Sequence, residues 1–142
     1  MQVNFLRLDR ELPIPVTAHI DDAAVDLHTR IDLMLAPGVR AAVPTGIAVA
    51  IPVGFAGLIL PRSGHAHRHG IGVVNGPGLI DSGYRGEISV LLINHGEEDA
   101  EFRRGDRIAQ LAIVPIPAVE WVEVDDLDET DRGAGGFGST GQ

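Results

Sequence analysis

The segment Asn75-Gly-Pro-Gly-Leu-Ile-Asp81-Ser-Gly-Tyr84-Arg-Gly-Glu87 is punctuated by glycine and proline and lies between two apolar stretches. This punctuation predicts a tight hairpin, because glycine permits unusual dihedral angles and proline fixes its own φ. A carboxylate, Asp81, and an aromatic ring, Tyr84, stand three residues apart within it. We expect the hairpin to hold Asp81 rigidly at the mouth of a pocket.

The rest of the chain also alternates short apolar stretches with turn residues. Eighteen glycines and nine prolines suit many tight turns, and apolar residues nowhere recur with the helical period of 3.6 over a long window. The pattern predicts an all-β fold of many short strands with at most one short helix, either a sandwich or a distorted jelly-roll barrel. The predicted strands cover residues 24–27, 42–50, 56–60, 71–74, 88–94, 108–114 and 119–124.

The length of 142 residues, 44% of them apolar, predicts one domain with a real core. Beyond Trp121 the chain becomes acidic and then rich in glycine. Such a stretch is too polar and flexible to build core. We therefore expect a barrel over residues 1–124, with residues 125–142 as a flexible glycine-rich C-terminal arm of the same domain.

The overall charge and the absence of certain segments exclude several classes of function. The net charge is −9 and no basic stripe is present, which argues against a nucleic-acid partner. No stretch resembles a secretory signal or approaches the ~20 apolar residues of a membrane span. There is no cysteine, which fits a reducing compartment. We expect a cytoplasmic protein, and any anionic ligand then needs local arginines and a divalent cation.

Two further segments carry residues suited to phosphate. Arg62, Ser63 and Gly64 follow an apolar strand, and they offer a bidentate guanidinium, a hydroxyl and close backbone approach. The segment lacks the spacing of a Walker A loop, and alone it fits a simple turn equally well. In the tail, Arg132 and Phe137 are separated by glycines, and an extended chain between them spans about 16 Å. Phe137 has no core to join, so a ligand or another subunit is its expected partner.

Three histidines alternate at His65, His67 and His69. Alternate residues of a strand share one face and could bind a metal ion. The favoured interpretation is a polar loop near phosphate, and the sequence leaves the purpose of these histidines open.

Taken together, these segments resemble the trimeric all-β dUTPases, which hydrolyse dUTP to dUMP and pyrophosphate. The resemblance runs from Ala23 to Gly141 in the family's order, although the family usually has leucine where His65 stands. It implies that Asp81 is the general base that activates a water for attack on the α-phosphorus. It implies phosphate contacts from Arg62, Ser63, Gly64, Gln110, Arg132, Ser139 and Thr140. It also implies nucleoside contacts from Asn75, Leu79, Ile80, Tyr84, Ser89 and Phe137.

The resemblance further implies a cofactor and an assembly. Asp26 would help to hold a hydrated Mg²⁺ on the triphosphate. Tyr84 would pack on the deoxyribose and exclude a 2′-hydroxyl group. The protein would be a homotrimer, in which each site takes the Asp81 hairpin from one chain, the phosphate-binding segments from a second and the tail from the third.

Two other functions stay open at this point. A dCTP deaminase shares the fold but removes the amino group of the base and leaves the triphosphate whole. A noncatalytic nucleotide-binding regulatory module would lack the base or the tail, whereas Asp81, Arg132 and Phe137 are present.

Overall fold

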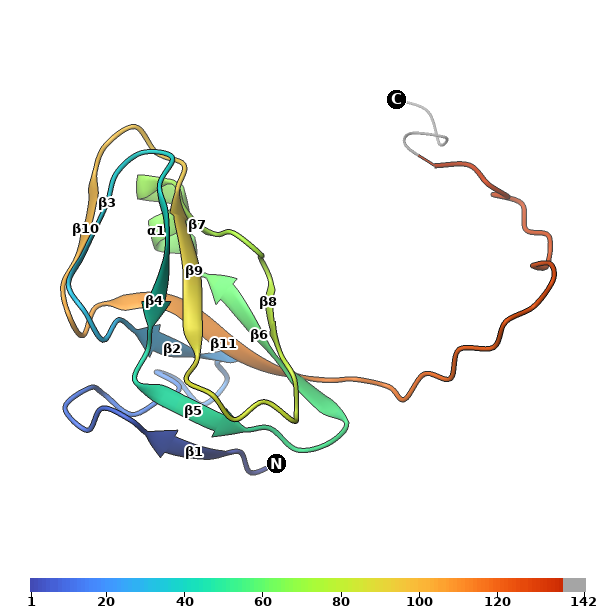
Figure 1. Ribbon diagram of the computed structural model, residues 1–142, viewed down its shortest axis with the longest axis horizontal. Coiled ribbons are helices and arrows are strands. Elements are labelled where there is room, and N and C mark those ends of the chain that lie inside the picture. Colours follow the sequence, from blue (N-terminus) through green and yellow to red (C-terminus); the bar gives the residue numbers. More distant parts are fainter. Residues whose placement is uncertain (137–142) are drawn as a thin grey trace.

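The structure is a computed structural model that describes residues 1–136. In these residues, short strands fold around one core and a long arm leaves the barrel at its C-terminal end (Figure 1). The elements are β1 (Asn4–Arg7), β2 (Ala24–His28), β3 (Leu33–Leu35), β4 (Arg40–Pro44), β5 (Ile47–Ala50), β6 (Phe55–Pro61), α1 (Ser63–His69), β7 (Ile71–Val73), β8 (Gly78–Ile80), β9 (Ser89–Asn94), β10 (Ala100–Phe102) and β11 (Arg107–Pro115).

The strands form antiparallel sheets that share one apolar interior. The largest sheet has the order β2-β11-β6-β8, and a second has the order β4-β9-β7. Strand β1 pairs with β5, and β10 pairs with β3. Leu27, Ile59 and Leu111 of the first sheet pack in the same core as Val90 and Leu92 of the second. Burying each such side chain contributes about 1.5–3 kcal/mol, so the interior fixes the sheets that carry the predicted site residues.

The all-β prediction is confirmed, with one short helix added. Six of the predicted strands overlap observed ones. The range 42–50 is two strands, β4 and β5, because the chain turns at Gly46, whose φ of 73° favours glycine. The sequence missed β1, β3, β8 and β10, each only three or four residues long. Strands of this length carry too few alternations to be recognised without their partners.

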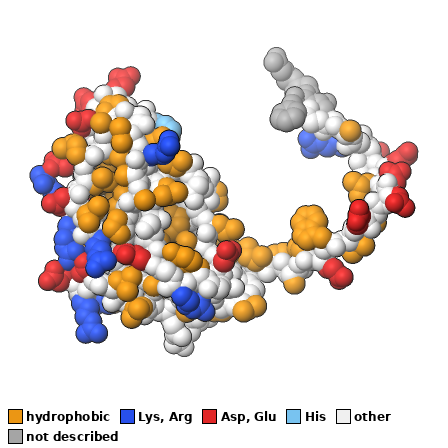
Figure 2. All heavy atoms as spheres, in the orientation of Figure 1, with side chains coloured by type: hydrophobic (Ala, Val, Ile, Leu, Met, Phe, Trp, Pro, Cys, Tyr) orange, Lys and Arg blue, Asp and Glu red, His pale blue; other side chains and the backbone are white. Residues whose placement is uncertain are grey.

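The predicted strand at 119–124 is wrong. These residues follow β11, have no strand partner within residues 1–136, and belong to the arm that leads away from the barrel. Their apolar side chains are exposed, and Trp121 keeps 92% of its surface accessible. Figure 2 shows apolar side chains along the arm beside acidic ones. A β-forming composition needs a free sheet edge to pair with, and this segment meets none in the described part of its own chain.

The one helix in residues 1–136, α1, is neither long enough nor apolar enough to cross a bilayer.

Candidate active site

Two predicted site residues, Arg62 and Gln110, meet around the carboxylate of a third, Asp26, at the end of the largest sheet. Strand β11 lies between β2 and β6, so that Gln110 faces Asp26 on one side and Leu60 on the other. Arg62 follows β6, and its Nε donates to Asp26 Oδ1 at 2.9 Å. Gln110 Nε2 lies 3.5 Å from the same oxygen. The sheet register thus gathers an arginine, an amide and a carboxylate from three distant segments.

A second arginine belongs to this cluster. Arg107 Nη1 lies 3.4 Å from Asp26 Oδ2, and its side chain is half exposed. Arg62 and Arg107 thus contact the two different oxygens of one carboxylate. Such a pair offers planar, bidentate donors to an anionic ligand.

Ser63 and Gly64 directly follow Arg62 and begin α1. Ser63 is exposed, so its hydroxyl is accessible to a ligand. A Cβ added to Gly64 would lie 3.1 Å from Arg68 Nη2, and Arg68 Nε donates to the Gly64 carbonyl at 3.2 Å. Arg68 therefore adds a third guanidinium beside the predicted phosphate segment. No sequence motif pointed to Arg68, because only the helical turn brings it back to Gly64.

The histidine run is a helix, so both the strand and the loop interpretation were wrong. In a helix, residues two apart point to different sides, so His67 lies away from the face that His65 and His69 share, where their ring centroids are 6.1 Å apart. Across residues 1–136, no group of three or more histidine, cysteine or acidic side chains is placed to hold a metal ion. His65 instead packs edge-on against Phe102, with ring centroids 5.3 Å apart. Its Nε2 lies 3.0 Å from the Arg107 carbonyl, which ties α1 to the start of β11.

This packing predicts a loss of stability in acid. Burial lowers the pKa of His65 from its ordinary 6.5, and the bond to the Arg107 carbonyl only partly opposes this. The unfolded chain then binds the proton more readily, so the folded state loses stability as pH falls through about 6.5 and is unaffected well above it. His65→Leu should reduce the fall in Tm between pH 8 and pH 5. Part of the decrease in Tm should remain in this variant, because burial also lowers the pKa of His28.

Thermal melts across this pH range check the prediction. His67→Leu, on the exposed side of the same helix, is the matched control and should keep the wild-type dependence. An unchanged pH profile in His65→Leu would show that His65 does not contribute to the acid sensitivity.

The predicted tight hairpin is wrong in one respect: β8 pairs with β6, whereas β9 pairs with β4 and β7, so the strands on either side of the turn do not pair with each other. We keep the name hairpin for residues 75–87, which carry Asp81 at the surface rather than in the core. Strand β8 leads into the turn, and the Tyr84 N–H donates to the Asp81 carbonyl at 3.1 Å, which closes it. Asp81 is exposed and lines a surface pocket of about 370 Å³ together with Phe55, Leu79 and Ile116. A carboxylate at the rim of a pocket is accessible to both water and ligand.

The ring of Tyr84 is also held in a defined place. Its hydroxyl donates to the Glu87 carbonyl at 3.0 Å, and the ring lies over Gly86, where an added Cβ would collide with the hydroxyl. The side chain keeps 44% of its surface exposed. Of the other predicted nucleoside contacts, Ile80 is half-buried, and three are exposed: Asn75, Leu79 and Ser89.

The hairpin and the arginine cluster lie at opposite ends of β6. Ile80 pairs with Gly57 near the start of that strand, whereas Arg62 follows its end. A strand rises about 3.3 Å per residue, so the run from Gly57 to Arg62 spans roughly 17 Å. Within one chain, Asp81 is therefore far from the guanidinium groups.

Arg132, the predicted tail residue that the structure describes, lies apart from both groups. Arg132 is exposed on the arm, and its Nε donates to the Gly135 carbonyl at 3.0 Å. In Figure 1 the arm carries this region away from the barrel. Phe137, Ser139 and Thr140 lie outside the described residues.

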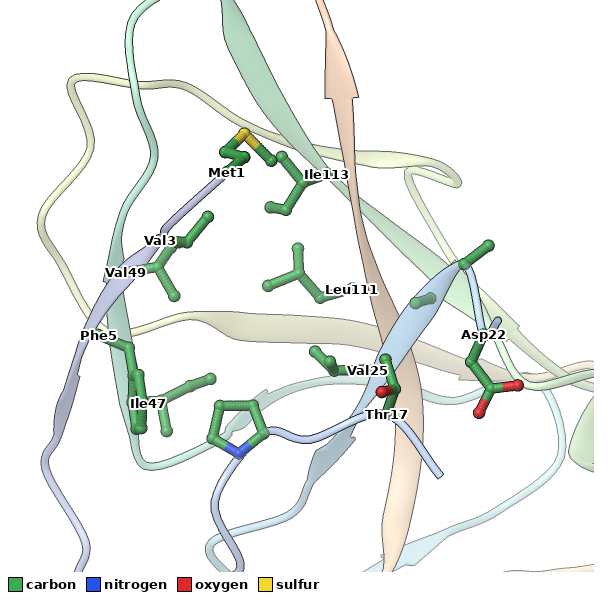
Figure 3. Close-up of a pocket in the computed structure, with 13 residues that line it drawn as sticks. Met1, Val3, Phe5, Thr17, Asp22, Val25, Ile47, Val49, Leu111 and Ile113 are labelled. Atoms are coloured by element: carbon green, nitrogen blue, oxygen red, sulfur yellow. The ribbon is translucent and has the colours of Figure 1, made fainter. Parts of the chain in front are cut away.

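A separate pocket of about 350 Å³ lies beside β1, β5 and β11 (Figure 3). Its lining is mostly apolar, with Val3, Val49 and Leu111 among the contributors. Asp22 is its one ionisable side chain among the described residues, and a pocket without a cation does not suit a phosphate. We do not place the predicted chemistry here.

A family model described as dUTPase matches residues 10–141. The deoxyuridine 5'-triphosphate nucleotidohydrolase of Nocardia farcinica is 60% identical over 136 residues, which cover 95% of this chain and 82% of the relative. That of Corynebacterium glutamicum is 53% identical over 141 residues, covering 99% and 95%.

Solved structures agree with these relatives. A variant dUTPase of Staphylococcus bacteriophage 80alpha with dUpNHpp superposes with a TM-score of 0.92 at 27% identity, covering 99% of each chain. A variant dUTPase of phage phi11, whose structure is described as revealing the coordination of a structural Mg(II) ion, gives a TM-score of 0.83 at 25% identity. It covers 89% of this chain and 98% of the phage protein.

Proposed function

This chain belongs to the dUTPase family and is a dUTP diphosphatase, and we propose that Asp81 activates the water that attacks the α-phosphorus. The Asp81 carboxylate accepts a proton from the water as its oxygen bonds to phosphorus. The bond between the α-phosphorus and its bridging oxygen breaks, which yields dUMP and pyrophosphate. A positioned carboxylate base contributes roughly 10²–10⁴-fold to such a step. The position of Asp81 at the rim of a pocket, on a hydrogen-bonded turn, is the observation that carries this proposal.

The phosphates bind at the cluster of Asp26, Arg62, Arg107 and Gln110. Here the ion pairs to Asp26 hold the two guanidinium groups close together before substrate arrives. Ser63 and Gly64 lie next to Arg62, where a hydroxyl and a backbone N–H can reach a phosphate oxygen at the bond being cleaved. Fixed donors of this kind stabilise the charge that develops in the transition state.

The same cluster suits Mg²⁺ held through water. Mg²⁺ keeps several of its waters and binds through one or two carboxylates plus substrate phosphates, and Asp26 is a single, partly accessible carboxylate beside the proposed phosphate positions. When bound, the ion neutralises charge on the triphosphate. Asp26 would accept a hydrogen bond from a water of the ion, and Arg62 and Arg107, which contact Asp26, would bind the phosphates beside it.

Selectivity for deoxyuridine resides in the hairpin. The exposed ring of Tyr84 packs on the deoxyribose and leaves no room for a 2′-hydroxyl group. Leu79, Ile80 and the hairpin backbone enclose the base, and a narrow site of this kind rejects the extra methyl group of thymine by sterics. Asn75 and Ser89 supply the polar groups that read the uracil edge.

The active site is shared between chains of a homotrimer. The separation of roughly 17 Å along β6 is too large for one chain to place Asp81 and its own Arg62 on one phosphate group. When a neighbouring chain places its Arg62 cluster beside the Asp81 hairpin, Arg62 and Asp81 can both reach one phosphate group. The arm brings Arg132, Phe137, Ser139 and Thr140 from a third chain to close over the nucleotide.

Pyrophosphate release from dUTP, UTP, dCTP and dTTP, with and without Mg²⁺, tests the function. Release should be fast with dUTP and Mg²⁺ and weak with the other three nucleotides. Ammonia from dCTP without pyrophosphate from dUTP would identify a deaminase instead. Binding of dUTP with no product of either kind would identify a noncatalytic module.

A further inference from the structure

We propose that Glu87 is a positioning residue that sets the place of Tyr84, and through it the rejection of ribonucleotides. This inference rests on the proposed role of Tyr84. Glu87 ends the hairpin segment, and nothing in the sequence pattern distinguishes it from an ordinary surface carboxylate.

The carboxylate of Glu87 fastens the hairpin to the barrel. Its Oε1 accepts a hydrogen bond from the Gly46 N–H at 2.8 Å, and its Oε2 lies 3.4 Å from Arg30 Nη1. Only 25% of the Glu87 side chain is exposed. Gly46 is itself fixed, because an added Cβ there would lie 2.9 Å from both Asp9 Cβ and Leu12 Cδ1. The side chain is therefore anchored at a rigid turn between β4 and β5.

The backbone of Glu87 holds the other end of the arrangement. Its carbonyl accepts the Tyr84 hydroxyl at 3.0 Å, and the Tyr84 N–H in turn donates to the Asp81 carbonyl at 3.1 Å. A continuous set of contacts thus runs from Gly46 through Glu87 to Tyr84 and Asp81. The Glu87 carbonyl belongs to the same planar peptide as the Ile88 N–H and keeps its place. Release of the Glu87 side chain instead frees the preceding peptide at Gly86, so the Tyr84 ring shifts relative to its acceptor.

The charge network behind Glu87 keeps its arginine partner in place. Arg30 Nε also lies 3.4 Å from Asp9 Oδ2, and Arg104 bonds to both Asp9 oxygens. The Arg104 hydrogen bond lowers the pKa of Asp9 to about 2, so Asp9 is charged at neutral pH and attracts Arg30. The network spans the N-terminal loop, the segment after β2 and the turn before β11.

Glu87 is more than a fold anchor because its neighbour already serves that purpose. The Ile88 N–H donates to the Ile47 carbonyl at 2.9 Å, and the Thr45 N–H and hydroxyl both donate to the Ile88 carbonyl. Ile88 is fully buried. These bonds hold the strand end without Glu87, so the carboxylate acts chiefly on the residues before it, where Tyr84 lies.

The test is the ratio of kcat/KM for dUTP to that for UTP. This ratio is independent of how much of a preparation is folded, because both substrates report on the same active fraction. Glu87→Ala should lower the ratio about 10-fold or more, since displacement of a site group by about 1 Å can cost up to 10²-fold. Glu87→Asp, whose carboxylate is one methylene shorter, should lower it too. Glu87→Gln, which keeps an acceptor for the Gly46 N–H, should keep most of the wild-type ratio.

Glu11→Ala is the matched control. Glu11 bonds Arg104 at 2.8 Å in the same network but lies outside the hairpin, so the ratio should stay at the wild-type value. A wild-type ratio in both Glu87→Ala and Glu87→Asp would overturn the inference while the proposed function stands. Failure of the wild-type enzyme to prefer dUTP would instead overturn the proposed role of Tyr84.

Discussion

Replacing Asp81 with asparagine should lower kcat for dUTP by about 10²–10⁴-fold and leave nucleotide binding close to that of the wild type. Asparagine has the same shape but cannot accept the proton of the attacking water. The side chain is exposed at the rim of a pocket, so the fold and melting temperature should not change. The turn itself should persist, because it is closed by the Asp81 carbonyl rather than by the side chain.

Single-turnover pyrophosphate release measures the chemical step, and titration with dUpNHpp, the nucleotide present in the similar phage structure, measures binding. Asp99→Asn, an exposed acid on a distant loop, is the matched control and should keep wild-type kcat. An unchanged kcat in Asp81→Asn would remove Asp81 from the chemistry. A large loss of dUpNHpp affinity would assign it to binding instead.

The sequence was a good guide where one segment carries its own signal. Glycine and proline around Asp81 predicted a tight hairpin, and the turn is there with the carboxylate exposed, although the strands on its two sides pair elsewhere. Short Val- and Ile-rich stretches predicted most of the strands. Both signals are local, because they depend on dihedral preferences and on period-two alternation within a few residues.

The sequence was a poor guide where the outcome depends on a partner. Residues 119–124 have strand composition but meet no sheet edge among residues 1–136. The histidine run alternates like a strand, yet α1 forms there, and Gly70 ends it with a left-handed φ of 66°. A glycine after a run of polar residues is a helix stop signal, so Gly70 is the one local sign of this helix in the sequence.

Strand register could not be predicted from the residues alone either. The meeting of Asp26 with Arg62 and Gln110, and the contacts of Glu87 with Gly46 and Arg30, join residues tens of positions apart. Strand pairing decides such contacts, and strand order is not encoded in any one segment. The resemblance to trimeric dUTPases implied the shared site, whereas the register along β6 supplies a physical reason for it.

Two inactive variants should restore activity to each other when they assemble together. Arg62→Gln removes the proposed phosphate contact and leaves the base Asp81 intact. Asp81→Asn removes the proposed base and leaves the phosphate contact of Arg62 intact. Each should be nearly inactive alone. If every site takes Asp81 from one chain and Arg62 from another, a mixed trimer contains some sites in which both residues are native. With random assembly of equal amounts, about a quarter of the sites meet this condition.

The decisive measurement is therefore the specific dUTP hydrolysis activity of oligomers purified after the two variants are produced together at equal levels. The shared-site account predicts recovery to about a quarter of wild-type activity, far above either variant alone. Activity no higher than that of the separate variants, in oligomers shown to contain both chains, would contradict it and place the whole site within one chain.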